Sequence, residues 1–272
     1  DAPPIALELE QRFKGRAILP TDPVHACLSH LIEDMGDEWL TKAMFHDRWF
    51  YAADRDFASW WITTDHFSGD TPLDERRAFA KEICERQVSR MALVDCTEEN
   101  RGVIEESFGR VVDALETHAG LGSYLFGTRP SLGDFGLFGQ LRTLADDPTS
   151  MTEMRRRAPT LVHWIRQTDD LSGLEGAWAA SDADLPDALH ALLRVCGEAY
   201  LPFLAANAAG VENGDDEVRM TIFGRPYAQA PFRYQVKCLG RMRSLYGHLK
   251  GDDKTRADAI LGPAGCLDVL AG

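Results

Sequence analysis

Three consecutive ionisable residues, His46, Asp47 and Arg48, form the pattern in this sequence that most directly suggests acid–base chemistry. A histidine can exchange a proton near neutral pH, and a carboxylate beside it can assist. Neighbours on a helix point in different directions, so these three side chains are not expected to converge on one substrate. The preferred prediction is therefore an ordinary polar helix end beside the core, with an acid–base group as the alternative.

Cysteine is the other candidate nucleophile. The six cysteines, at positions 27, 84, 96, 196, 238 and 266, include no C-x-x-C pair, so their spacing favours neither a zinc site nor a disulfide framework. Cys96 lies near a predicted helix start, where the helix dipole would lower the thiol pKa, and an inert loop thiol is the alternative. The sequence lacks the zinc motif H-E-x-x-H, so no metal site is predicted. It also lacks the nucleophile motif G-x-S-x-G and the glycine-rich phosphate-binding patterns.

The clearest helix start lies in the stretch from Gly127 to Leu144. Ser131 and Asp134 have the spacing of a capping box, in which each side chain accepts a hydrogen bond from the backbone of the other residue. Apolar residues then recur at three-residue spacing, which predicts a buried helix. Glycines at 133, 136 and 139 each cost about 1 kcal/mol relative to alanine in a helix, so another segment is expected to approach this backbone closely.

A second long helix is predicted from Pro23 to Met44, capped by Asp22 or Thr21 and carrying an apolar stripe. Its four acids are expected to be solvated, with a smaller chance that one borders a ligand or a dimer interface: Glu33, Asp34, Asp37 and Glu38. Further helices are expected over 151–170, 185–209, 232–249 and 254–261, and a β-hairpin near residues 218–229. The predicted fold class is therefore all-α, a helical bundle with one small β-hairpin.

Charge and hydropathy narrow the class of protein. The 43 acidic residues exceed the 29 basic ones, giving a net charge of −14, which argues against nucleic acid and anionic membranes as partners. No apolar run is long enough to span a bilayer, and the first residues lack the pattern of a signal peptide. A cytoplasmic protein is expected.

Two segments carry a family resemblance. Tyr124 to Leu141, Y-L-F-G-T-R-P-S-L-G-D-F-G-L-F-G-Q-L, followed by Pro159 to Trp164, P-T-L-V-H-W, resembles the sixth-helix signature of the glutathione transferase superfamily's helical C-terminal domain. The opening D-A-P-P-I-A-L-E-L-E and the linker that follows are similar to the end of that family's thioredoxin-like first domain. The resemblance implies a remnant and linker over 1–20, a transferase-like helical domain over 21–181, and a helical extension over 182–272. It also implies that roughly 70 to 80 residues of the parent fold are absent upstream.

The same resemblance implies glutathione as co-substrate. Asp1 matches the acid of an acid–serine pair that holds the γ-glutamyl carboxylate, but Ala2 stands where the family has serine, which removes a hydroxyl donor. The family's thiol-activating residue lies in its first domain, so the catalytic residue is unknown here. The function implied is the second-substrate side of a glutathione-dependent, thiol-conjugating transferase. The alternative is a non-catalytic binding or assembly module that kept the fold and lost the cofactor.

Family geometry also implies where a small apolar electrophile would bind, at seven positions on the second and the capped helices: Trp39, Ala43, His46, Trp49, Gly136, Gln140 and Thr143. The alternative is that the tryptophans belong to the core and the glycines admit a neighbouring helix. The resemblance, with the broad apolar face of the Pro23 to Met44 helix, also predicts a homodimer.

Overall fold

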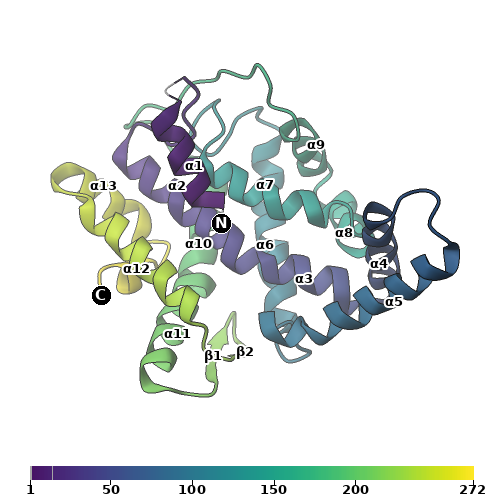
Figure 1. Ribbon diagram of the computed structural model, residues 1–272. Helices are drawn as coiled ribbons and strands as arrows, with labels where there is room; N and C mark the ends of the chain where they lie inside the picture. Colours follow the sequence, from purple (N-terminus) through teal and green to yellow (C-terminus); the bar gives the residue numbers. More distant parts are fainter. Residues whose placement is uncertain (1, 14) are drawn as a thin grey trace.

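The computed structural model describes residues 2–13 and 15–272, which are mostly helical with one antiparallel pair of strands. In chain order the elements are α1 (Ala2–Arg12), α2 (Pro23–Met35), η1 (Gly36–Leu40), α3 (Thr41–Phe50), α4 (Ala52–His66), α5 (Leu73–Ser89), η2 (Met91–Val94), α6 (Arg101–Ala119), α7 (Leu132–Leu144), α8 (Pro148–Arg157), α9 (Pro159–Thr168), α10 (Asp187–Val195), η3 (Cys196–Tyr200), α11 (Leu201–Asn213), β1 (Val218–Ile222), β2 (Arg225–Gln229), α12 (Arg233–His248), α13 (Gly251–Leu261) and α14 (Leu267–Leu270). The predicted helical bundle with a small hairpin is confirmed (Figure 1).

The helices α2, η1 and α3 follow one another without a break from Pro23 to Phe50 across the middle of the molecule (Figure 1). Asp22 begins the run, because its side chain accepts hydrogen bonds from the backbone N–H of Val24 and of His25, at 3.0 and 2.9 Å. The predicted helix from Pro23 to Met44 is confirmed and continues six residues further. Its middle is a π turn, which holds one residue more than an α turn.

Helix α7 packs against α2, and its glycines explain how closely. A Cβ added at Gly136 would lie 2.8 Å from the Cα of Glu33, and one at Gly133 would lie 3.0 Å from the carbonyl oxygen of Ser29. Gly139 faces open space, so the expected close approach is confirmed at two of the three glycines and is wrong at the third. The capping box of Ser131 and Asp134 is present as predicted.

The segment after residue 182 packs along the other sides of the central helices. Helix α10 lies on α6, while η3, α12 and α13 contact α2. Four aromatic rings join these parts of the core, with Trp39 packing against Tyr200, Phe203 and Tyr227. The apolar face of α2 is therefore buried within the chain, between α7 and the C-terminal helices.

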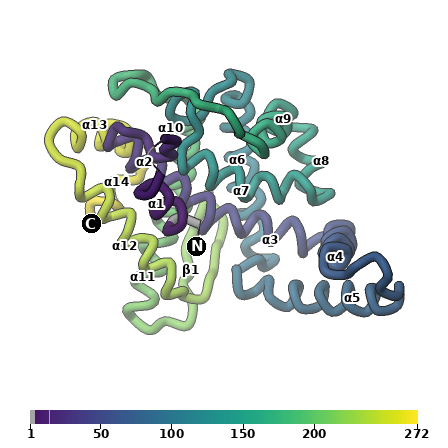
Figure 2. Tube along the Cα trace, turned by 45° about the horizontal axis from the view of Figure 1, so that its top comes forward, coloured from purple at the N-terminus to yellow at the C-terminus, as the bar shows by residue number. Residues whose placement is uncertain are grey.

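Helices α4 and α5 form a hairpin that projects from the rest of the molecule (Figures 1 and 2). Helix α5 has no fully buried residue, and Phe57 and Trp60 of α4 are 43% and 42% exposed. The hairpin is thus attached mainly through α4, which contacts α3 and α8.

Strands β1 and β2 pair antiparallel, from Val218 opposite Gln229 to Ile222 opposite Arg225. Phe223 and Gly224 connect them with φ of 52° and 72°, the backbone that a two-residue hairpin turn requires. The predicted hairpin is confirmed, with Pro226 in its second strand. None of the helices that the structure describes combines the length and the apolar character needed to cross a lipid bilayer.

Candidate functional site

The predicted site residues of the long central helix point into the core. Trp39 and Ala43 are each 2% exposed, and the indole N–H of Trp39 donates a 3.0 Å hydrogen bond to the Ser107 hydroxyl of α6. Trp49 is likewise buried and packs on Phe45. Trp39 thus faces α6 and the C-terminal segment, and none of the three side chains lines the clefts described below.

His46 is also fully buried, stacked on Phe50 with ring centroids 4.5 Å apart. Its Nε2 lies 3.8 Å from a carboxylate oxygen of Glu105, and neither ring nitrogen has a hydrogen-bond partner within the described ranges. Burial lowers the pKa of His46, and Glu105 opposes that shift only partly. The imidazole is therefore neutral at physiological pH.

The predicted residues of α7 lie elsewhere, along a strip that we call the seam, where η1 and α3 run beside α7. Gly136 rests on Glu33, the arrangement that the packing alternative describes. Gln140 hydrogen bonds to Asp37, and the Thr143 carbonyl accepts from Arg48 at 3.4 Å. The structure thus separates the seven predicted residues into a buried group on the central helix and a group on α7, where Gly136 is buried and Gln140 and Thr143 are half-buried.

The π turn explains part of this separation. Because it adds one residue, it rotates the following residues by about 100° relative to a regular helix. Side chains of Asp37 and Arg48 consequently reach the seam, while Trp39 and His46 face α6. A regular helical repeat does not show this change of face, and neither Asp37 nor Arg48 is among the seven predicted positions.

The four acids around the π turn are not solvated as predicted. Glu33 and Asp34 are 3% and 5% exposed, and Asp37 and Glu38 are half-buried. Burial raises the pKa of Glu33 to about 8 and of Glu38 to about 7. Packing by α7 and α12 causes the burial, and the Tyr200 hydroxyl donates a 2.6 Å hydrogen bond to Asp34. No pattern within the helix itself indicated these partners.

Cys96 is buried, and its thiol donates to the Lys42 carbonyl at 3.2 Å. Burial raises the pKa of Cys96 to about 12, with Lys42 opposing the shift. The structure therefore favours the alternative of an inert thiol at Cys96, because a thiolate at this position is strongly disfavoured at neutral pH.

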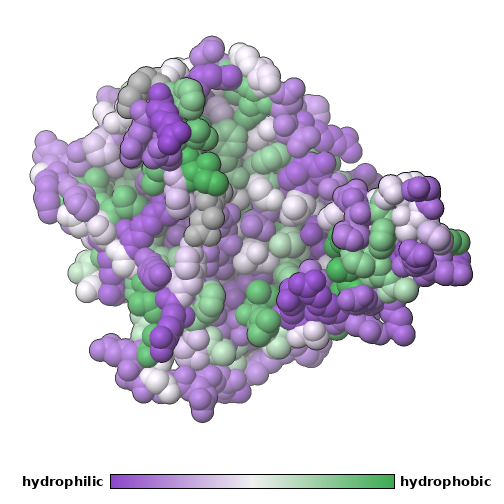
Figure 3. Space-filling model, viewed as in Figure 1, coloured by the Kyte–Doolittle hydropathy of each residue, from purple (hydrophilic) through white to green (hydrophobic). Residues whose placement is uncertain are grey.

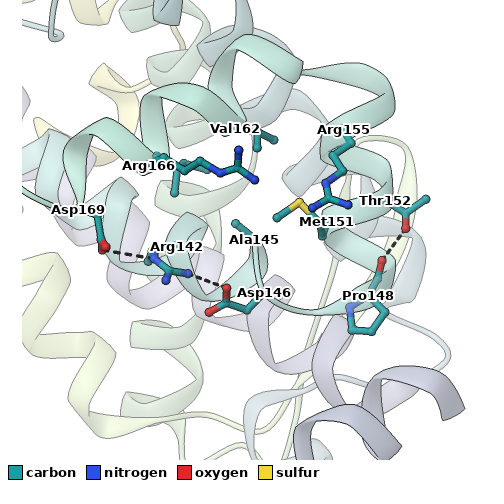
Figure 4. A pocket seen from close by; sticks show the side chains of 11 residues that line it. Arg142, Ala145, Asp146, Pro148, Met151, Thr152, Arg155, Val162, Arg166 and Asp169 are labelled. Carbon is teal, nitrogen blue, oxygen red and sulfur yellow. Dashed lines mark hydrogen bonds and ion pairs between the residues drawn. The ribbon is translucent and has the colours of Figure 1, made fainter. Parts of the chain in front are cut away.

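A cleft of about 610 Å³ lies between α7, α8 and α9. Arg142 bridges Asp146 and Asp169 along one side, while Arg155 and Arg166 extend toward the opening from the two other helices (Figure 4). Arg155 and Arg166 are exposed, so water can solvate their charges without a ligand. The cleft can attract anions, but none of its arginines is a buried charge that requires an anion as its partner.

A second cleft, of about 600 Å³, lies between the α3–α4 junction, α6 and α8. Asp47 lines it and is 7% exposed. The side chains of the His46 to Arg48 run diverge as predicted: His46 faces Glu105, Arg48 pairs with Asp147 at 3.0 Å, and Asp47 faces this cleft. The run lies near the end of α3, which stops at Phe50, so the predicted helix end beside the core is confirmed, with His46 and Asp47 buried in it.

Residues 78–167, from within α5 to near the end of α9, match the family model described as glutathione S-transferase, C-terminal domain. Residues 78–167 therefore belong to a glutathione S-transferase C-terminal domain. The match contains the capping box and the Pro159 to Trp164 segment on which the resemblance was based. A search of curated proteins and a search of solved structures each gave no significant match.

Asp1, the predicted glutathione ligand, lies outside the described residues. Across residues 2–13 and 15–272, no three His, Cys, Asp or Glu side chains are grouped closely enough to hold a metal ion.

Proposed function

We propose that this chain is the helical half of a glutathione-dependent, thiol-conjugating transferase. It would work with a glutathione-binding, thioredoxin-like half and take a small apolar electrophile as second substrate. The glutathione S-transferase C-terminal domain at residues 78–167 supports the family. What supports a second half is the surface of α1.

Helix α1 and Phe13, which directly follows it, present an exposed apolar stripe. Ile5, Leu9 and Phe13 recur at four-residue spacing and are 62%, 47% and 66% exposed. Hydrophobic surface is visible beside α1 in the space-filling view (Figure 3). Exposed apolar side chains aligned on one face mark an interaction surface, and this stripe carries the proposal. A packed second half would cover it.

The seam is the proposed place of the electrophile. It carries half-buried polar groups, Asp37 and Gln140, which can orient a ligand at the surface where a second half would close the site. The thiol-activating group would come from that half.

Two experiments test the proposal. Reading the coding sequence upstream of Asp1 should show a thioredoxin-like stretch with a Cys, Ser or Tyr after its first strand, and a start codon at or just before Asp1 would contradict it. In a glutathione-conjugation assay of that whole protein with an aryl halide, Gln140→Ala should raise the KM for the aryl halide several-fold while the KM for glutathione stays unchanged. Gln167→Ala, at an exposed position on α9, is the matched control.

A second candidate, the non-catalytic binding module, is favoured by one observation. Trp39, Ala43, His46 and Trp49, expected to form the substrate wall, are all in the core. Calorimetry that detects no glutathione binding to the whole protein at millimolar concentration would favour this module and count against the enzyme.

A further inference from the structure

The cleft between the α3–α4 junction, α6 and α8, which we call the Asp47 cleft, contains a buried carboxyl group without a counter-charge. The Asp47 side chain makes no hydrogen bond or ion pair with any residue that the structure describes, although the residue is only 7% exposed. An isolated carboxylate in such a position is costly, so that its presence calls for an explanation.

The two nearest buried carboxyls show the contrast. Asp147 is paired with Arg48 at 3.0 Å, and Asp54 accepts hydrogen bonds from the backbone and the hydroxyl of Thr149 at the start of α8. Of these three buried carboxyls, one is thus paired with a guanidinium group and one with hydrogen-bond donors. Among the three, Asp47 is the one whose carboxyl has no hydrogen-bond or ion-pair partner within the described residues.

None of the other charged groups that line the cleft forms an ion pair with Asp47. Arg157 is already bound to Asp113 and Glu153 across the rim. Glu105, the remaining rim acid, accepts a 2.6 Å hydrogen bond from the Tyr51 hydroxyl. Every cation beside the cleft is thus engaged, and the groups that remain are negative.

The floor of the cleft is apolar. Phe108 and Val112 of α6 line it and are 6% and 0% exposed. The volume of about 600 Å³ lies within the range of sites for small organic ligands, roughly 300 to 1,000 Å³. A ligand that combines an apolar body with a positive charge would match both parts of the lining.

We propose that the Asp47 cleft binds a small organic cation, whose ammonium or amidinium group pairs with Asp47 while its apolar body rests on Phe108 and Val112. The ligand supplies the counter-charge that the chain lacks, and Glu105 and Glu153 at the rim attract it. This site is separate from the seam, so its test does not depend on the transferase proposal.

Binding of the cation is coupled to the loss of a proton from Asp47. Burial, with the charges of Asp54, Glu105, Asp147 and Glu153, raises the pKa of Asp47 to about 8. The other titratable or charged groups that face it are Arg48, Tyr51, Cys96 and Arg157. A bound cation stabilises the carboxylate, so binding at pH 7 releases up to one proton. The dissociation constant should fall about tenfold per pH unit up to about pH 8 and level off above it.

Calorimetric titration with 2-phenylethylammonium tests the site. We expect binding at pH 8.5 that Asp47→Asn weakens at least tenfold and that Asp216→Asn, the same charge removed from an exposed loop, leaves unchanged. The neutral isostere 2-phenylethanol should bind at least tenfold more weakly. Equal affinity for the alcohol, equal affinity of the Asp47→Asn protein, or no binding of the ammonium at millimolar concentration would each overturn the proposal.

A further measurement uses only the unmodified protein. Titrations at pH 7 in two buffers of different ionisation enthalpy should differ in heat by the amount that corresponds to one released proton. Binding without proton release would place the cation away from Asp47, and it would overturn the proposal even if the Asp47→Asn protein failed to fold.

Discussion

Ser131 and Asp134 hold the start of α7 through more bonds than a capping box requires. The Asp134 carboxylate accepts from the backbone N–H of Ser131 at 2.8 Å and also from that of Leu125 at 3.1 Å. Asp134 therefore ties the preceding loop to the helix, and its loss leaves two backbone donors without a partner.

We expect Ser131→Ala to lower the free energy of unfolding by about 0.5 to 2 kcal/mol. Asp134→Ala should cost at least as much because of the Leu125 N–H, and the double variant less than the sum because the two share bonds. Urea melts of the three proteins measure these differences. Single variants that both unfold like the unmodified protein would contradict the role of the cap.

Gly136 and Gly139 provide a matched pair on the same helix. A Cβ at Gly136 would press on the backbone of Glu33, so Gly136→Ala should cost about 1 to 3 kcal/mol. Gly139 has open space around it, so Gly139→Ala should stabilise by up to about 1 kcal/mol through helix propensity. Thermal melts that show the same sign for both variants would contradict this assignment of the packed glycine.

At the scale of elements, features encoded by neighbouring residues could be predicted from the sequence. The cap at Ser131, the start at Asp22 and the Phe223–Gly224 turn each depend on residues a few positions apart. The π turn at Gly36–Leu40 has no such local signal, and it decides which residues reach the seam. The predicted site residues therefore stay a prediction, and the structure adds that the side chains of the central helix point into the core.

The α4–α5 hairpin should be the least stable large element. Helix α5 has no fully buried residue, whereas α7 is buried along most of its length. Segments with few buried contacts open at a lower free energy than the core. In hydrogen-exchange mass spectrometry, the amides of Leu73–Ser89 should exchange at least tenfold faster than those of Leu132–Leu144. Equal protection of both helices would show that the hairpin unfolds only with the whole protein.

At the scale of the whole molecule, contacts between distant parts of the chain account for what the sequence did not reveal. Asp34 is bonded to Tyr200, 166 positions later, so the burial of the acids around the π turn depends on a segment whose packing no local pattern encodes. The same C-terminal segment covers the face of α2 on which the homodimer was predicted. The homodimer stays a prediction, but the apolar face of α2 is already buried within the chain and does not need a second copy to cover it.

Those buried acids determine how stability depends on pH. The pKa values of Glu33 and Asp47 are raised to about 8 and that of Glu38 to about 7, so between pH 6.5 and 8 the folded protein holds protons that the unfolded chain has lost. Stability must therefore fall as pH rises through this window. Buried histidines such as His30, whose pKa is lowered to about 4, act in the opposite direction below about pH 6.5.

We expect the free energy of unfolding to decrease by up to about 4 kcal/mol from pH 6.5 to 8, since each of the three groups contributes at most about 1.4 kcal/mol per pH unit. Urea melts at three pH values in this range measure the slope. Glu33→Gln and Asp47→Asn should each make it shallower, because an amide cannot lose the proton whose retention favours the folded state. A stability that is constant or rises across the window would mean that these carboxyls ionise in the folded protein as readily as in the unfolded chain.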